Sequence, residues 1–527
     1  MWIFAILVMA AVTLPYLNAY ANQRSGWTFT GFLFGVSDGN SYIAKMLLGS
    51  WGEWLFRTPY TAYPQDGLFL FFPYVLLGKL AQPPLVHDQL VVLYHIYRLA
   101  AGLLMIHATY DFISIFLHEP RWRRFATVLA ILGGGFGWIT IFGLSHIFAW
   151  GLPPESYSPE GFGFLSIYGL PHLAAARALL LWGLRDFLVR TDWYRSSRGW
   201  MRTGLTWAAI GLFQPIIQAV GMFVVAFFLL ITGVVQWFRW RAHREAYWRR
   251  WFEHVFSGMA IAVCAAPLAA YTFFSFRLNP TLQAWEQQSI IGSPPPLEYL
   301  IGYGVALPLA LLGVRPLLRK LPWHGWLLAG WMIFVPIAAY GPFPSQRRFL
   351  DGFWVALSIL AVSLLLILTP KQRKVAIGWI SLAFPMTLFL LTAGFLFSGN
   401  PSAPLFRPTD EVKVFEYLAQ NAQPWSVVLA SDDTANPLPA WAPVRTLIGH
   451  GPESLNGVIL RERIACFYSS TCTEAERKAL LQEFRIDYVI WGPGERELGD
   501  WDPNQWGQLQ EVFEYGAYQV FQTSESK

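Results

Sequence analysis

The chain has 527 residues, of which 54% are hydrophobic, 17% aromatic and only 13% charged. This composition excludes an ordinary water-soluble globular protein and predicts a polytopic membrane protein. The net charge of +5 is explained by basic residues that flank membrane spans, so we expect no nucleic-acid partner. Three cysteines exclude a disulfide scaffold and a cysteine-rich zinc or iron–sulfur site.

About eleven segments are long and apolar enough to be candidate spans, since a spanning helix needs about 20 mostly apolar residues. Continuous apolar runs favour helices over a β-barrel, whose strands alternate. The predicted fold is therefore α-helical within the membrane. The candidate spans are 1–21, 89–117, 125–149, 170–189, 203–215, 216–238, 251–276, 297–318, 325–341, 350–369 and 375–398.

Lys and Arg residues beside the spans predict the orientation. With a cytoplasmic N-terminus, about seventeen lie in the inner loops and about seven in the outer loops that precede the C-terminal segment, as expected for a protein of the cytoplasmic (inner) membrane. The long loop 22–88 and the C-terminal segment then lie outside. Ala19-Tyr20-Ala21 also suits a signal-peptide cleavage site, although no Lys or Arg precedes the apolar run. The loop is external under either interpretation.

The loop 22–88 is long enough to be functional. It contains Val36-Ser37-Asp38-Gly39-Asn40-Ser41-Tyr42, in which Asp38 could act as a general base on an acceptor hydroxyl. The alternative is that Asp38 caps the helix that carries Tyr42. We expect Asn40, Tyr42 and, farther along the loop, Asp66 to lie near the substrate.

The composition changes after the last span. Residues 1–398 are expected to form the transmembrane domain, 399–408 a linker and 409–527 a soluble extracytoplasmic α/β domain. In this last segment, Asp410 to Asn421 predicts an amphipathic helix, and 426–430 and 486–491 predict buried strands. Thr473 and Glu476 predict a capping box at the start of a helix. We expect the domain to cover the site or to select the acceptor.

Cys466 and Cys472 are separated by five residues, and the predicted topology places them outside the cytoplasm. A disulfide that closes the turn before Thr473 is therefore predicted. The alternative is that Cys466 packs as a small apolar residue on the inner face of a helix.

The outer-loop Asp38, the downstream Tyr42, about eleven spans and the external C-terminal domain together resemble the GT-C superfamily of integral-membrane glycosyltransferases. The resemblance implies a sugar donor linked to polyprenyl phosphate, with Asp38 as the catalytic acid and Tyr42 as the aromatic residue after it. Many relatives have two adjacent acids, whereas Gly39 and Asn40 follow Asp38 here. One carboxylate is a poor site for a hard cation, so we expect no metal and no other cofactor.

The phosphate of such a donor needs fixed cations, and Arg347 and Arg348 break the positive-inside trend just before a span. The alternative is interfacial snorkelling, with Arg348 paired to Asp351. Arg177, inside a span, is a further candidate for phosphate binding. His172 could contact the phosphate or a sugar hydroxyl, or could be an ordinary interfacial residue.

Three other patterns remain, and the last two of them have simple structural explanations. Glu155 and Glu160 are candidate acceptor contacts. The basic and aromatic run 239–251 predicts a cytoplasmic interfacial helix on anionic lipid. The glycines of 133–137 lie in an apolar span, where close helix packing explains them.

The sequence thus predicts an inverting transferase that moves a sugar from a polyprenyl-phosphate donor to the hydroxyl of a glycan, lipid or protein acceptor at the outer face of the membrane. The alternatives are a non-enzymatic or transport protein that binds lipid-linked glycans, and a silent subunit of a membrane complex.

Overall fold

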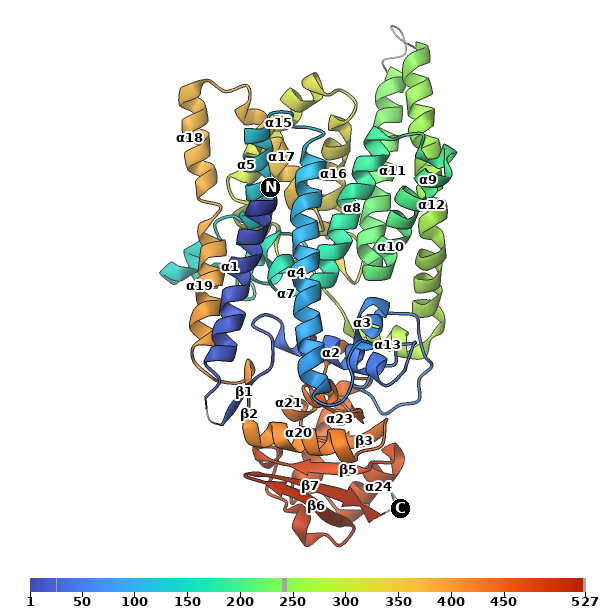
Figure 1. Ribbon diagram of the computed structural model, residues 1–527, viewed down its shortest axis with the longest axis vertical. Coiled ribbons are helices and arrows are strands. Elements are labelled where there is room, and N and C mark those ends of the chain that lie inside the picture. The colour runs from blue at the N-terminus through green and yellow to red at the C-terminus, as the bar shows by residue number, and fades with distance from the viewer. Residues whose placement is uncertain (25, 239–243, 525–527) are drawn as a thin grey trace. The chain divides into compact units, whose positions relative to one another are not determined.

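The computed structural model describes residues 1–24, 26–238 and 244–524 (Figure 1). The chain forms two compact units. The helical unit comprises Met1–Leu14, Tyr97–Phe274 and Ile290–Gly394, and the mixed unit comprises Pro15–Ile96, Ser275–Ser289 and Phe395–Lys527. The predicted domain 409–527 thus belongs to one unit with the first outer loop, and its independence as a domain stays a prediction.

The described residues contain six helical segments that are long and apolar enough to cross a membrane, as expected for a multi-pass membrane protein. A seventh is formed if α14 and α15, which meet at an angle of 78°, count as one broken span. The predicted number of eleven is not confirmed. The six are Trp2–Ala21, Val86–Ile113, Pro215–Val235, Tyr247–Leu278, Gln346–Leu365 and Pro370–Ser398.

The helices of the helical unit are mostly apolar, and α17 lies at its centre, with every residue of the helix buried. Gly313 allows α15 to approach α17 closely, because a Cβ at that position would lie 2.0 Å from the carbonyl oxygen of Leu360. The helices are α1 (Trp2–Ala21), α4 (Val86–Ile113), α5 (Pro120–Leu132), α7 (Phe164–Gly169), α8 (Pro171–Val189), α10 (Leu205–Phe213), α11 (Pro215–Phe238), α12 (Arg244–Leu278), α14 (Pro296–Tyr303), α15 (Ala306–Lys320), α16 (Gly325–Ala339), α17 (Phe353–Leu365), α18 (Pro370–Ser381) and α19 (Pro385–Ser398).

One predicted span, 125–149, is wrong in detail. The helix α5 ends at Leu132 because Gly133 turns the backbone to an extended conformation, and only short 3-10 turns follow. Glycine favours such a break because it loses more conformational freedom than other residues in a helix. The glycines do serve close approach, since a Cβ on Gly135 would lie 2.3 Å from the carbonyl oxygens of Ile301 and Gly302.

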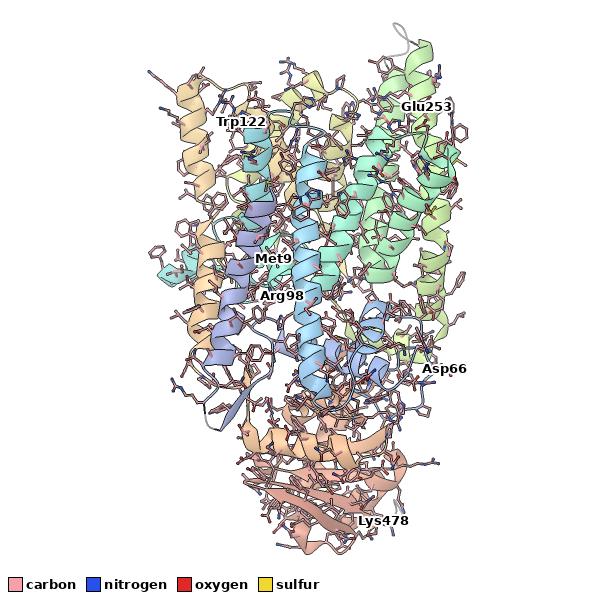
Figure 2. All side chains as sticks on the ribbon, in the orientation of Figure 1. Met9, Asp66, Arg98, Trp122, Glu253 and Lys478 are labelled. Carbon is pink, nitrogen blue, oxygen red and sulfur yellow. A yellow bond between two sulfur atoms is a disulfide. The ribbon has the colours of Figure 1, made fainter. Side chains whose placement is uncertain are left out.

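Arg98, in the middle of α4, is fully buried (Figure 2). Its guanidinium donates hydrogen bonds to the Thr13 hydroxyl at 2.9 Å and to the Ile167 carbonyl at 3.5 Å. A buried cation with protein acceptors stabilises one arrangement of α1, α4 and α7, so we assign Arg98 to the fold.

The C-terminal part of the mixed unit contains a five-stranded sheet in the order β4-β3-β5-β7-β6. Strand β3 pairs in parallel with β4 and β5, whereas β7 pairs antiparallel with β5 and β6. The strands are β3 (Ser426–Leu429), β4 (Val444–Thr446), β5 (Tyr488–Trp491), β6 (Leu509–Tyr515) and β7 (Tyr518–Thr523). The last residues of the predicted linker also form a strand, β2 (Phe406–Pro408), which pairs with β1 (Trp27–Phe29).

Alternating side chains of the sheet enter two apolar cores, as the period of a strand requires. Val427 and Val489 pack with α23 (Gly457–Tyr468) and α24 (Glu474–Phe484). Val428 and Ile490 pack with α20 (Thr409–Asn421) on the other face. The mixed unit also contains α2 (Val36–Ser50) and α3 (Phe72–Gly78) from the first outer loop, and α13 (Pro280–Gln288).

Candidate active site

Helix α2 positions Asp38. Its N-cap residue is Gly35, with φ of 58°, and no side chain caps the helix, so Asp38 is not the capping residue. Asp38 lies in the first turn, where the helix dipole stabilises a negative charge. Its side chain is 56% exposed. The helix therefore presents a carboxyl group that is open to solvent.

His450, far away in the sequence, contacts this carboxylate. Its Nε2 lies 3.1 Å from Asp38 Oδ1, and its Nδ1 lies 3.1 Å from Glu453 Oε1. The imidazole itself is largely buried. Because a carboxylate lies at each ring nitrogen, the doubly protonated imidazolium is the form that satisfies both contacts.

Glu453 is held from several sides in the interior of the mixed unit. Its Oε1 is 2.6 Å from Lys45 Nζ and accepts a hydrogen bond from Ser41 Oγ at 2.8 Å, and its Oε2 accepts from Thr58 Oγ1 at 2.6 Å. Lys45 also donates to Ser41 and lies over the Phe71 ring, with Nζ 4.5 Å from the ring centroid. These contacts fix the acid that in turn positions His450.

The charges of this cluster have opposing effects on protonation. Burial alone would lower the pKa of His450, but Glu453 and Asp38 raise it to about 9. Burial alone would raise the pKa of Glu453, but Lys45 and His450 lower it well below its usual range. At neutral pH, His450 is therefore a cation that lies between the carboxyl groups of Asp38 and Glu453.

The other residues predicted in the outer loop do not all gather at Asp38. Asn40 donates to the Asn436 side chain at 2.8 Å, and Asn436 in turn donates to Ser37 Oγ at 2.9 Å, beside Asp38 in the chain. Tyr42 stacks on Tyr74 with ring centroids 4.8 Å apart. Asp66 lies on an exposed part of the loop (Figure 2).

His450, Glu453 and Lys45 are not among the site residues predicted from the sequence. One local signal was present, because His450-Gly451-Pro452-Glu453 places a titratable pair on a turn. No local pattern connects that turn to Asp38, since 412 positions of the sequence separate Asp38 from His450.

Of the predicted phosphate ligands, Arg347 and Arg348 lie in one short 3-10 turn, Gln346–Leu350, of the helical unit. Arg347 Nε is 3.4 Å from Glu160 Oε2, and its guanidinium lies 5.2 Å from the centroid of the Tyr157 ring. Arg348 is half-buried, and within the described ranges its side chain has no acidic or aromatic partner. Of these two arginines, Arg348 is thus the one whose cation is not already paired.

Arg177 is buried and engaged with protein groups. Its guanidinium donates to both Asp351 oxygens, at 2.8 and 3.0 Å, and to the carbonyls of Pro159 and Phe162 at 2.7 and 3.0 Å. This corrects the alternative pairing of Arg348 with Asp351. It also gives Arg177 a structural task, holding the loop before α7 in place. His172 lies in the first turn of α8, five residues before Arg177.

Glu155 is 3% exposed and closes the glycine segment after α5. Its Oε1 accepts hydrogen bonds from the backbone N–H groups of Gly135 and Gly137, at 3.1 and 2.9 Å. Burial raises the pKa of Glu155 to about 7, although these backbone donors lower it.

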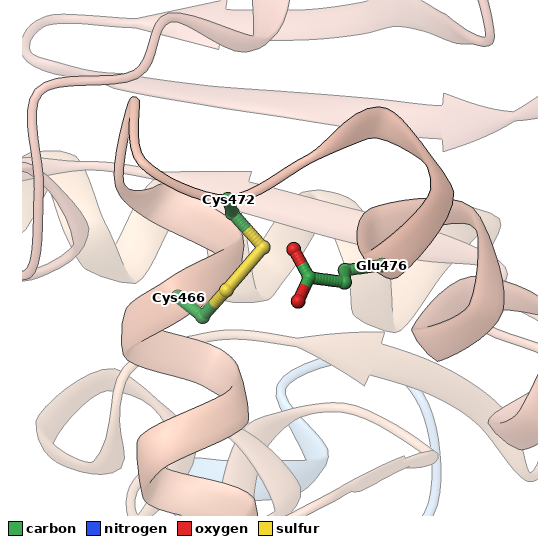
Figure 3. A group of neighbouring side chains, drawn as sticks. All are labelled: Cys466, Cys472 and Glu476. Carbon is green, nitrogen blue, oxygen red and sulfur yellow. A yellow bond between two sulfur atoms is a disulfide. The ribbon is translucent and has the colours of Figure 1, made fainter.

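Cys466 and Cys472 are joined by a disulfide, with Cα atoms 5.2 Å apart (Figure 3). The capping box of Thr473 and Glu476 is confirmed at the start of α24. These two cysteines and Glu476 form the one group of His, Cys, Asp or Glu side chains close enough to hold a metal ion among the described residues. Because both sulfurs are in the disulfide, the group lacks the thiolates that bind metals.

The predicted interfacial helix at 239–251 falls partly on residues 239–243, which lie outside the described residues. The remainder of the run belongs to α12, which begins at Arg244. The paired Trp248 and Trp251 rings, with centroids 5.4 Å apart, lie on this helix.

Comparison with solved structures shows which fold this is. The chain is similar to ArnT from Cupriavidus metallidurans bound to undecaprenyl phosphate, with a TM-score of 0.50, 15% identity and coverage of 99% of this chain and 98% of that one. It is also similar to the oligosaccharyltransferase AglB from Archaeoglobus fulgidus, in complex with an inhibitory peptide and a dolichol-phosphate. Here the TM-score is 0.51 and the identity 13%, and the match covers 93% of this chain and 70% of that one. A third similar structure is the arabinofuranosyltransferase AftD from Mycobacteria, with a TM-score of 0.53, 13% identity and coverage of 98% of this chain and 41% of that one.

Scans against protein-family models and against curated protein sequences found no match. The likeness is therefore one of structure. The chain has the fold of the GT-C glycosyltransferases, as the resemblance in its sequence predicts.

Proposed function

We propose that this protein is an integral-membrane glycosyltransferase that transfers a sugar from a polyprenyl-phosphate donor to an acceptor hydroxyl. The observation that carries the proposal is the exposed carboxylate of Asp38, held by the buried His450 on a GT-C fold. A fold alone does not define a reaction, so the site residues decide the function. The undecaprenyl phosphate and dolichol-phosphate bound by ArnT and AglB support the choice of a lipid-phosphate donor.

The proposed reaction is inverting. The acceptor oxygen attacks the anomeric carbon on the face opposite the phosphate, and the bond from that carbon to the phosphate oxygen breaks. Asp38 receives the acceptor's proton, and the polyprenyl phosphate leaves with the electron pair of the broken bond. The His450 contact fixes the carboxylate so that its other oxygen faces the acceptor.

We assign the phosphate of the leaving lipid chiefly to Arg348. Charge grows on this phosphate as the bond breaks, and a guanidinium can bind two of its oxygens at once. Arg347 is already balanced by Glu160, so a phosphate would have to compete with that carboxylate. His172 remains a proposed contact to the phosphate or the sugar. Arg177 contributes indirectly, through its hydrogen bonds to Asp351 and to the loop before α7.

We further propose that the protein resides in the inner membrane with its N-terminus in the cytoplasm, about eleven spans, and 409–527 outside. The acceptor is a glycan, lipid or protein hydroxyl. Labelling of single cysteines placed in the predicted inner loops and in 409–527 tests this topology. Labelling of the C-terminal segment from the cytoplasmic side would overturn it.

The decisive experiment uses the full chain in nanodiscs with a panel of undecaprenyl-phosphate monosaccharides. Release of undecaprenyl phosphate is measured with lipid, glycan and protein acceptors, and Asp38→Asn is the control. Turnover of one donor by the wild type, lost in the variant, supports the proposal. Equal release in both proteins, or none with any donor, contradicts it.

A further inference from the structure

A second polar cluster lies wholly within the helical unit, and the mechanism above does not use it. It is formed by the loop before α7, by α14 and by the turn that carries Arg347. Its members are Glu155, Tyr157, Glu160, Glu298, Tyr303 and Arg347. We call it the Tyr157 cluster.

Five atoms of the Tyr157 cluster are buried and make no hydrogen bond with the part of the chain that the structure describes. They are Glu155 Oε2, Tyr157 Oη, Glu298 Oε2, Tyr303 Oη and Arg347 Nε. Buried polar atoms are nearly always hydrogen-bonded, because each unmade bond costs roughly 1–3 kcal/mol. Arg347 Nε faces Glu160 in an ion pair, so the other four atoms are the ones with neither a hydrogen bond nor an ion pair among the described residues. Four such atoms in one place indicate that a polar molecule belongs there.

The side chains concerned are not merely loosely placed at the surface. Glu155, Glu298 and Tyr303 are each 3% exposed or less. In both acids one oxygen is fixed by backbone donors, Gly135 and Gly137 for Glu155 and Ala149 for Glu298 at 2.8 Å. Each carboxylate is therefore held in place while its second oxygen points to no donor.

These residues act on one another across a short distance. Burial and the carboxylate of Glu298 raise the pKa of the Tyr157 hydroxyl, and the Arg347 guanidinium lowers it. A Cβ added to Gly302 would lie 3.2 Å from Glu155 Oε2, and one on Gly161 would lie 3.5 Å from Tyr303 Oη. Two glycines thus leave space beside two of the atoms that lack partners.

The chemistry of the cluster defines its ligand. Two carboxylate oxygens can only accept hydrogen bonds when ionised, two phenols can donate or accept, and Arg347 Nε can only donate. A ligand with several hydroxyl groups supplies both kinds of partner. Three carboxylates beside one guanidinium disfavour an anion, so we do not assign a second phosphate here.

Aromatic rings line the same place. Tyr303 already stacks on both Tyr299 and Trp354, each with ring centroids 5.8 Å from its own, so the ring that is open to a ligand is that of Trp150. Trp150 is 52% exposed, and its ring centroid lies 5.1 Å from that of Tyr157. Rings beside acidic side chains suit a sugar, whose C–H face packs on the ring while its hydroxyls bond to the acids. We infer that the Tyr157 cluster binds a sugar ring, and this deepens the proposed function by giving the transferred or accepting sugar a subsite.

The segment 144–150 lies against the cluster. It runs between Gly143 and Gly151, which have φ of 80° and 67°, and a Cβ at either position would meet no atom within 4 Å. Its contacts with the cluster are the Ala149 N–H bond to Glu298 and the Trp150 ring on Tyr157.

The test does not need the lipid donor. Saturation-transfer NMR with the full chain in detergent measures binding of methyl glycosides of neutral and amino pentoses and hexoses. We expect at least one glycoside to bind the wild type, and Glu155→Gln and Tyr303→Phe to weaken it at least fivefold. Tyr110→Phe, which removes a hydroxyl elsewhere in the helical unit, should bind as the wild type does.

A second, milder variant guards against misfolding. Gly302→Ala adds one methyl group toward Glu155 Oε2 and should reduce binding while size-exclusion behaviour stays normal. The inference is overturned if no glycoside binds, or if the glutamine, phenylalanine and alanine variants bind as tightly as the wild type. Glycoside binding without any donor turnover would leave this subsite standing and reject the proposed reaction instead.

Discussion

His450 Nε2 lies 3.1 Å from Asp38 Oδ1, and this contact joins the C-terminal part of the mixed unit to the segment 22–88. The histidine is held in turn by Glu453, and Glu453 by Lys45. A chain of alternating charges thus ends at the one member whose side chain is more than half exposed. This arrangement orients the proposed base without burying it.

Asp38→Asn should leave folding intact and lower sugar transfer by about 10²–10⁴-fold, because an amide cannot accept the acceptor's proton. The exposed side chain makes little packing contact, so thermal stability should change little. Turnover with the undecaprenyl-phosphate panel measures the effect. Transfer at near wild-type rates would eliminate Asp38 as the general base.

His450→Gln should lower turnover about tenfold, which corresponds to the loss of about 1.4 kcal/mol of transition-state stabilisation. It should also change the pH profile. The folded-state pKa of His450 is raised from its ordinary value of 6.5 to about 9. The stability that its charge contributes is therefore complete below about 6.5 and is lost as the pH rises through about 9.

The same shift predicts a decline of wild-type turnover near pH 9, because Asp38 then loses its cationic partner. The decline should be absent in His450→Gln. NMR titration of the ring tests the coupling without any substrate, since Asp38→Asn should lower the pKa of His450. A ring that titrates identically in both proteins would show that the contact has no electrostatic role.

Arg348→Ala should weaken the binding of undecaprenyl phosphate about tenfold, and Arg348→Lys should restore part of it as a simpler point charge. Arg347→Ala is the matched comparison. Arg347→Ala leaves the buried Glu160 without its cationic partner, so this variant should lower thermal stability more than Arg348→Ala does. Native mass spectrometry of lipid binding and a melting curve separate the two effects. Equal lipid affinity in all variants would reject the phosphate site.

Local patterns predicted the fold well where local physics decides it. The predictions of a capping box at Thr473, a helix from Asp410 to Asn421 and a strand at 486–491 rest on capping and periodicity. The structure contains all three, with the helix at Thr409–Asn421 and the strand at Tyr488–Trp491. The span at 125–149 was predicted from the number of apolar residues alone. That number does not reveal that α5 ends at Gly133, because Glu155 and Ala383, which accept hydrogen bonds from the glycine segment, lie elsewhere in the sequence.

The candidate site shows the same limit more strongly. Asp38 was accessible to sequence reasoning because it lies beside Gly39 in an outer loop. Its partner His450 was not, since the contact depends on how β4 and α23 are placed by the sheet. Arg177 was predicted as a ligand because an intramembrane charge suggests function. In the folded chain, Asp351 and backbone carbonyls accept hydrogen bonds from its guanidinium and balance its charge. The sequence does not show these contacts.

The disulfide between Cys466 and Cys472 gives the last prediction. The two residues flank the turn between α23 and α24, where Arg477 donates to the carbonyls of Phe467, at 2.8 Å, and of Ser469. Because these hydrogen bonds hold the turn independently, and because a loop this short gains only about 2 kcal/mol from the bridge, Cys466→Ser with Cys472→Ser should fold and retain full turnover. Its melting temperature should fall by a few degrees.

Intact-mass analysis of unreduced, denatured wild type should show two unreactive cysteines and one alkylated, Cys264. Alkylation of all three would mean that the bridge does not form, and would remove one argument for placing this segment outside the cytoplasm.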